Sequence, residues 1–172
     1  FFTASRNPIV WPPEFGQSEL SGWELMTSAW DSRWYSLIIE EGYPSTLPVD
    51  ENGNVAQNQW AFYPLFPMIA RLLSTVTGIN VGTAGVTVSL AMGLSAVLLV
   101  RKLILTVWPG SATIVPWVLF TAPLVLAAYP AAGFFNTAYS DATALAVVML
   151  MLVLLTSKRY ARLCLIILVL DS

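Results

Sequence analysis

The chain has 172 residues, of which 56% are hydrophobic and only 10% are charged. Soluble domains usually carry about 25% charged residues, so we expect a membrane protein that crosses the bilayer several times. The chain has no histidine and a single cysteine, which excludes Ser-His and Cys-His catalytic groups, imidazole metal sites and a disulfide framework. Its net charge of −2 excludes the basic surface of a nucleic-acid-binding protein.

The charged and apolar residues are unevenly distributed along the chain. Most acidic side chains fall within residues 1–62, whereas the chain after residue 80 is mainly apolar. The chain begins with Phe1 rather than Met, and it stops soon after an apolar run that is too short to cross a bilayer. We therefore expect it to be a fragment of a longer protein, or the product of a poorly bounded gene.

An aromatic, Pro-rich segment and an amphipathic helix are predicted first. Residues 1–18 are typical of an extended loop at the membrane interface. A helix that lies on the membrane is predicted from Ser18 or Ser21 to about Glu41, ended by Gly42 and Pro44. Its apolar stripe consists of Trp23, Met26, Trp30, Trp34, Leu37 and Ile38.

A polar loop and a second interfacial helix are predicted next. Residues 43–59 form the loop, with a turn at Asp50-Glu51-Asn52-Gly53-Asn54. A helix over residues 64–77 follows, because Pro64 and Pro67 suit a first helical turn, where no N–H donor is needed. At this length the helix is too short to span a bilayer.

Three apolar stretches of span length follow, and a fourth begins near the end of the chain. The predicted spans cover residues 81–100, 112–130 and 140–157, with a partial span over 163–172. Basic clusters follow the first span (Arg101-Lys102) and the third (Lys158-Arg159, with Arg162), and the positive-inside rule makes both clusters cytoplasmic. Residues 1–80 and the loop near 131–141 then lie on the extracytoplasmic side.

This topology predicts an all-α fold made of two parts. Residues 1–80 would form an extracytoplasmic loop region with interfacial helices, and residues 81–172 would form part of a multi-pass transmembrane helical bundle. Asp31 and Asp141 would then share one compartment at the outer surface of the membrane.

Asp31 is the first candidate catalytic residue, because it lies among Trp30, Trp34 and Tyr35. Burial beside these rings would disfavour the charged carboxylate and raise its pKa, whereas Arg33 would lower it. Such a carboxylate suits general-base catalysis on a sugar hydroxyl, and the rings suit stacking against a sugar. The alternative is an ordinary acid on the wet face of the helix, with the tryptophans as membrane anchors.

Asp141 and Arg71 are further candidates. Asp141 begins the third predicted span, where the positive end of the helix dipole would favour its charge, and the alternative is a plain capping acid. Arg71, on the helix over residues 64–77, would bind a lipid phosphate through charge-assisted hydrogen bonds. The alternative is an arginine that extends to the lipid headgroups.

Four motifs, in this order, resemble those of PIG-V-type mannosyltransferases and their bacterial relatives, which are multi-pass GT-C glycosyltransferases linked to GPI-anchor biosynthesis. The resemblance covers residues 28–145. The motifs are Trp30-Asp31-x-x-Trp34-Tyr35, Gly42-Tyr43, Ala61-Phe62-Tyr63-Pro64-Leu65-Phe66-Pro67 and Tyr139-Ser140-Asp141.

The resemblance implies transfer of a mannosyl group, with inversion, from a polyprenyl- or dolichyl-phosphate donor to a glycan or lipid acceptor. Asp31 would match the catalytic acid of the first extracytoplasmic loop, and Asp141 would stand where the family has Glu. No cofactor is implied, and a divalent metal stays open. The residues expected to contact substrate are Trp30, Arg33, Trp34, Tyr35, Arg71 and Tyr139.

A non-enzymatic membrane protein, such as part of a transporter or an assembly subunit, is the rival interpretation. A transporter predicts charges or broken helices near the bilayer midplane. The predicted spans contain Pro116 and Pro123 but no midplane charge, which favours the enzyme. Its membrane would be a bacterial plasma membrane or, as the alternative, that of the endoplasmic reticulum.

Overall fold

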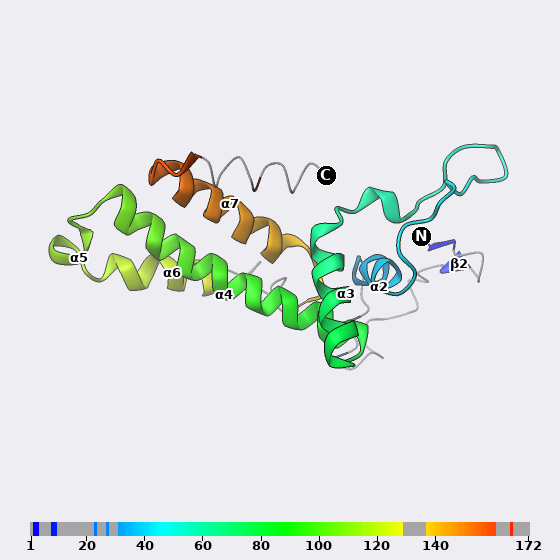
Figure 1. The fold of residues 1–172 in the computed structure, drawn as a ribbon, viewed down its shortest axis with the longest axis horizontal. Helices are drawn as coiled ribbons and strands as arrows, with labels where there is room; N and C mark the ends of the chain where they lie inside the picture. The colour runs from blue at the N-terminus through cyan, green and yellow to red at the C-terminus, as the bar shows by residue number, and fades with distance from the viewer. Residues whose placement is uncertain are drawn as a thin grey trace. The chain divides into compact units, whose positions relative to one another are not determined.

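In the part of the chain that the structure describes, the regular elements are helices, apart from two short antiparallel pairings. The computed structural model describes residues 2–3, 8–9, 23, 27, 31–128, 137–160 and 166. The pairings join β1 (Phe2–Thr3) to β2 (Pro8–Ile9), and Val49 to Val55. The helices are α2 (Ser32–Glu41), the 3-10 helix η1 (Gln59–Ala61), α3 (Leu65–Thr77), α4 (Val81–Val107), α5 (Ser111–Ile114), α6 (Val118–Ala128) and α7 (Asp141–Thr156) (Figure 1).

The chain divides into two compact units. The first comprises residues 1–86 together with 137–139, and the second comprises residues 87–136 together with 140–172. The predicted division into an extracytoplasmic part (residues 1–80) and a transmembrane part (residues 81–172) describes location relative to the membrane, and it stays a prediction. The predominantly helical character confirms the predicted all-α class.

In the first unit, α2 and α3 pack against each other, and both end where the sequence predicts. Gly42 ends α2 with φ +82°, and its N–H donates to the carbonyl of Ile38 at 3.0 Å. Gly78 ends α3 in the left-handed conformation, with φ +75°, which glycine adopts without strain. The predicted caps Ser18 and Ser21 lie outside the described residues. Trp23 and Thr27, which are described, are helical.

The loop between α2 and η1 contains the predicted turn. The Asp50 carboxylate accepts hydrogen bonds from the backbone N–H groups of Asn52 and Asn54, at 2.9 and 2.8 Å. Gly53 takes φ +79° and donates its N–H to the Asp50 carbonyl. The hydrogen bonds from Asn54 and Asn52 lower the pKa of Asp50, against a smaller opposing effect of desolvation.

The helix α4 is long and apolar enough to cross a membrane. Its length is 27 residues, and it is the one such helix in the described part of the chain. The prediction that this span ends at Arg101-Lys102 was wrong for the helix itself, which continues to Val107. The apolar run over residues 103–107 contains no helix-breaking residue before Pro109 and Gly110.

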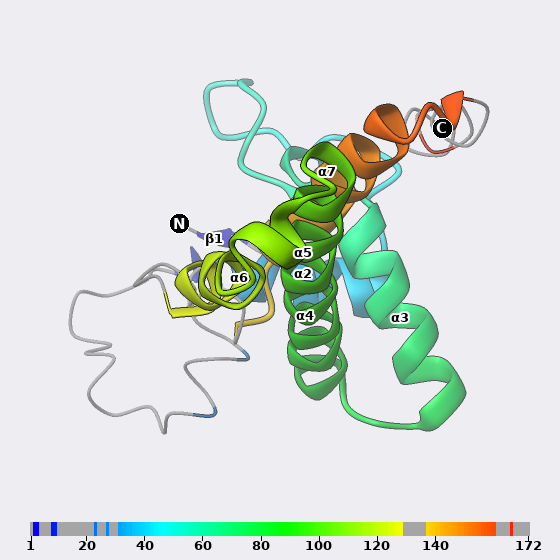
Figure 2. The same cartoon turned by 90° about the vertical axis from the view of Figure 1, so that its left-hand side faces the viewer.

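The second predicted span is broken, which corrects the expectation of one continuous helix over residues 112–130. The helix α5 ends before Val115, which has φ −140° and ψ 60°, and α6 begins only at Val118. Pro116 accounts for the break, because the residue before a proline is disfavoured in the helical region. The short α5 forms part of the turn between α4 and α6 (Figure 2). Residues 129 and 130 lie outside the described chain.

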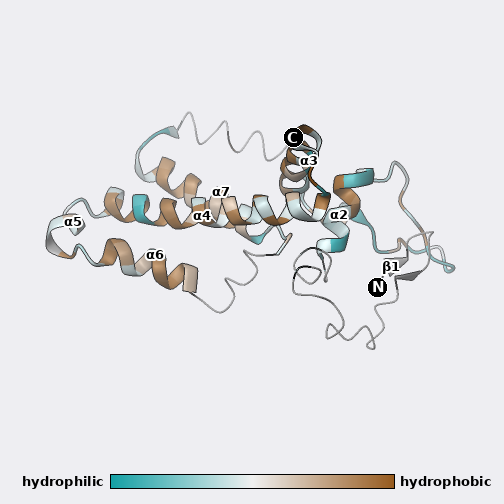
Figure 3. Cartoon of the chain, turned by 90° about the horizontal axis from the view of Figure 1, so that it is seen from below, coloured by the Kyte–Doolittle hydropathy of each residue, from teal (hydrophilic) through white to brown (hydrophobic). Residues whose placement is uncertain are grey.

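The other described helices of the second unit are apolar. Figure 3 shows that α4, α6 and α7 are predominantly hydrophobic, and the Arg101 guanidinium lies 5.7 Å from the centre of the Phe120 ring. The helix α7 lies within the predicted span over residues 140–157 but has only 16 residues, so a membrane span here stays a prediction. Lys158 follows it, with φ +56°. The predicted partial span lies outside the described chain, except for Ile166, which is helical.

Two glycines at the start of α4 permit close packing in the first unit. A Cβ on Gly82 would lie 2.8 Å from the Cβ of Thr27, and a Cβ on Gly85 would lie 2.8 Å from the Cβ of Ala138. Real Cβ atoms essentially never approach this closely. The segment over residues 137–139 can therefore contact α4 only because residue 85 lacks a side chain.

We expect Gly85→Val to lower the stability of the protein by about 1–3 kcal/mol, because the added side chain overlaps Ala138. The apparent melting temperature of the detergent-solubilised chain measures the effect. Ala91→Val is the matched control, since Ala91 is exposed on the same helix. Equal melting temperatures for the two variants would contradict this account of Gly85.

Candidate functional site

An aromatic cluster centred on Tyr35 brings three of the four motifs together. The Tyr35 ring packs edge-to-face against Phe62, with ring centroids 5.1 Å apart, and against Phe66 at 4.9 Å. Tyr139 lies 6.5 Å from Tyr35, and Trp34 lies 5.9 Å from Phe62. Residues from α2, from the tract before and within α3, and from the segment before α7 therefore form one cluster, which is buried except for the half-buried Phe62.

A hydrogen bond ties Asp31 to the same cluster. The backbone N–H of Asp31 donates to the hydroxyl oxygen of Tyr139 at 3.1 Å, across 108 positions of sequence. Asp31 occupies the N-cap position of α2. The first motif and the last one thus meet directly at the beginning of this helix.

The side chain of Asp31 is exposed rather than buried among aromatic rings, which corrects the expected burial. The rings of Trp34 and Tyr35 turn instead toward the interior of the first unit, where they are only 8% and 5% exposed. Tyr139 is buried as well, so the predicted sugar-stacking rings contact protein. Trp30 lies outside the described residues.

Arg33 and Ser32 complete the first turn of α2. Arg33 is partly buried, and desolvation lowers the pKa of its guanidinium. Ser32 is fully buried, and its hydroxyl has no hydrogen-bond partner within the described part of the chain. The sequence analysis missed Ser32, although it stands next to Asp31 in the first motif.

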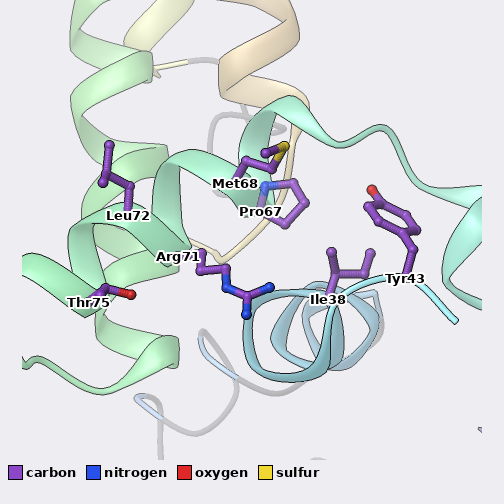
Figure 4. A pocket seen from close by; sticks show the side chains of 8 residues that line it. Ile38, Tyr43, Pro67, Met68, Arg71, Leu72 and Thr75 are labelled. Atoms are coloured by element: carbon purple, nitrogen blue, oxygen red, sulfur yellow. The ribbon is translucent and has the colours of Figure 1, made fainter. Parts of the chain in front are cut away.

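Arg71 lies at the opposite end of α2 from Asp31. It belongs to a groove of about 430 Å³ between α2 and α3, where Ile38, Pro67, Met68 and Leu72 supply the apolar walls. Figure 4 shows the Arg71 guanidinium directed toward α2, and a Cβ on Gly42 would lie 3.5 Å from Nη1 of Arg71. The ten residues of α2 separate its two ends by roughly 15 Å.

Tyr43 lies at the edge of this groove and was not predicted to be a site residue. Its hydroxyl donates to the Phe62 carbonyl at 2.8 Å, and its ring lies 4.6 Å from Trp60. Desolvation and, to a smaller extent, Tyr35 raise the pKa of the Tyr43 hydroxyl. The motif Gly42-Tyr43 was the sequence signal that could have identified it.

Asp141 is the first residue of α7 and belongs to the second unit. Its position in the first helical turn agrees with the predicted location at a helix N-terminus, and its side chain is exposed. Within the described ranges, no group of three or more His, Cys, Asp or Glu residues could hold a metal ion.

Comparison with known proteins gives no match: no protein-family model, no curated protein and no solved structure is similar to this chain.

We expect Tyr139→Phe to weaken the start of α2, because it removes the acceptor for the Asp31 N–H. The loss should cost about 1 kcal/mol and speed hydrogen exchange of the Asp31 amide several-fold, as measured by mass spectrometry. Tyr63→Phe is the control, since Tyr63 is 84% exposed. Unchanged exchange in Tyr139→Phe would show that this hydrogen bond does not hold the helix.

Proposed function

We propose that this chain is part of an integral-membrane, multi-pass glycosyltransferase of the GT-C type, resembling the PIG-V-type mannosyltransferases. It transfers a mannosyl group from a polyprenyl- or dolichyl-phosphate donor to an extracytoplasmic glycan or lipid acceptor. The reaction proceeds with inversion at the anomeric carbon, and Asp31 acts as the base.

The observation that carries this proposal is the meeting of the motifs around Tyr35. Phe62 and Phe66 lie about 30 residues after Tyr35, and Tyr139 lies more than 100 residues after it, yet all three rings neighbour its ring. Motifs that serve one site must converge in space. The tertiary contacts therefore support a common role for segments that the sequence alone only places in order.

The Asp31 carboxylate is exposed, so an acceptor hydroxyl could reach it from the water, although the burial expected to raise its pKa is absent. It would accept the proton of an acceptor hydroxyl while the hydroxyl oxygen attacks the anomeric carbon. The bond between that carbon and the phosphate oxygen breaks, and the lipid phosphate leaves with the electron pair. Arg33 and the N-terminal N–H groups of α2 would favour an anion near the same end of the helix.

Two further features support a role for Asp141 at this site and the location of the chain in a membrane. Asp141 follows Tyr139 by two residues, so the chain itself keeps it near a segment that contacts α2. The helix α4 has the length and hydropathy of a span, and we propose that α6 and α7 lie within further spans. Arg101-Lys102 and Lys158-Arg159 then mark the cytoplasmic side.

We expect Asp31→Asn to reduce sugar transfer by about 10²–10⁴-fold, since an amide cannot accept the proton. The assay follows transfer of radiolabelled mannose from polyprenyl-phosphate mannose by the full-length protein in lipid vesicles. Glu40→Gln, an exposed acid at the other end of α2, is the control. Normal transfer by Asp31→Asn would remove Asp31 from the mechanism and favour the non-enzymatic alternative.

Sidedness has its own test. In a Cys164→Ala background, a cysteine in place of Asn52 should react with a membrane-impermeant maleimide added outside intact cells. A cysteine in place of Ser157 should react only after the membrane is opened. Labelling of Ser157→Cys from outside, or protection of Asn52→Cys, would overturn the proposed topology.

A further inference from the structure

The groove around Arg71 has no part in the proposed proton transfer at Asp31. It opens at the C-terminal end of α2, roughly 15 Å from Asp31 along the helix. Its walls combine the side chains of Ile38, Met68 and Leu72 with one cation. An apolar groove that carries a single positive charge suits a ligand with an anionic group and a hydrocarbon chain.

The helix α3 continues this apolar surface beyond the groove. Met68, Leu72 and Val76 are 62%, 65% and 75% exposed, and their spacing of four residues aligns them on one face. The opposite face is covered, because Phe66 and Ala70 are buried. The exposed stripe is therefore an apolar helix face next to an arginine, which is typical of helices that lie in the membrane interface.

Arg71 is free to bind an anion. In the described ranges it makes no ion pair, and it is exposed at the groove. The acids that end α2, Glu40 and Glu41, are also exposed and do not line the groove. A guanidinium binds phosphate oxygens in a bidentate manner, which makes a phosphodiester the matching anion.

We propose that this groove binds the phosphate of a membrane phospholipid, with Arg71 on the phosphodiester and an acyl chain along Met68, Leu72 and Val76. The bound lipid holds α3 flat at the membrane surface. This site is separate from the proposed sugar-transfer site at the other end of α2, and it does not depend on that function. Arg71 is therefore proposed to bind this phospholipid instead of the sugar donor expected from the sequence.

The test is native mass spectrometry of the whole chain in a neutral maltoside detergent, with dioleoylphosphatidylglycerol as the probe. Arg71→Gln should weaken binding by about fivefold or more, since one arginine near a lipid phosphate contributes about that factor. Arg101→Gln is the matched control, because Arg101 is exposed on α4 and outside the groove. It should bind as the unchanged chain does.

Two further probes identify the ligand. Dioleoylglycerol has the same chains without phosphate and should bind much more weakly, and inorganic phosphate should not compete. Equal binding of dioleoylglycerol, competition by inorganic phosphate, or an equal loss in Arg71→Gln and Arg101→Gln would each overturn the proposal.

A second variant covers the case in which Arg71→Gln fails to fold. Leu72→Ser changes an exposed position and should also weaken binding of the phospholipid severalfold. Leu98→Ser, on α4, is its control, because Leu98 is 58% exposed. Unchanged binding in Leu72→Ser would contradict the proposed path of the acyl chain.

Discussion

The packing of Tyr35 holds distant parts of the first unit together, and the position of Asp31 depends on it. Tyr35 contacts Phe66 on one side and neighbours Tyr139 on another, and Tyr139 in turn accepts the Asp31 N–H. Each edge-to-face pair contributes about 0.5–1.5 kcal/mol beyond its buried area. These contacts offset the entropy lost when so long a stretch of chain closes on itself, and they fix the start of α2.

The cluster extends to α4 through a second set of contacts. Phe66 approaches both Tyr35 and the position that a Cβ of Gly85 would occupy, at 3.8 Å. Gly85 in turn lies against Ala138, the residue before Tyr139. The contacts thus form a closed path from Tyr35 through Phe66, Gly85 and Ala138 to Tyr139. In a path of this kind, displacement of one member moves the others, because packed side chains leave little free volume.

Local signals in the sequence predicted the features that single residues determine. Gly42 ends α2 with positive φ, and the turn at Asp50 forms through its own carboxylate. The break before Pro116 was missed because hydropathy alone suggested a continuous span, although the proline carried the necessary information. In these places the outcome depends on backbone chemistry within a few residues, which a sequence records directly.

The orientation of side chains was harder to predict. The sequence showed that Asp31, Trp34 and Tyr35 lie close together, but it did not show which of them faces water. Helical spacing puts Trp34 and Ile38 on one face, and the contact of Trp34 with Phe62, from another segment, helps to bury this face. The contact between Asp31 and Tyr139 depends on the tertiary fold and is absent from any local pattern.

The location of Arg71 relative to Asp31 has a mechanical consequence. Asp31 lies at the beginning of α2. Arg71 belongs to α3, which packs against α2, and lies beside the other end of α2. A rigid helix about 15 Å long transmits position from one end to the other. If a phospholipid phosphate at Arg71 fixes one end at the depth of the headgroups, the helix also fixes the depth of the carboxylate at Asp31. A lipid-linked sugar presents its reacting carbon next to its own phosphate, so the proposed sugar transfer would require an acid held at a defined depth. A phospholipid bound beside one end of α2 and a lipid-linked sugar at the other end would together hold the Asp31 carboxylate at that depth.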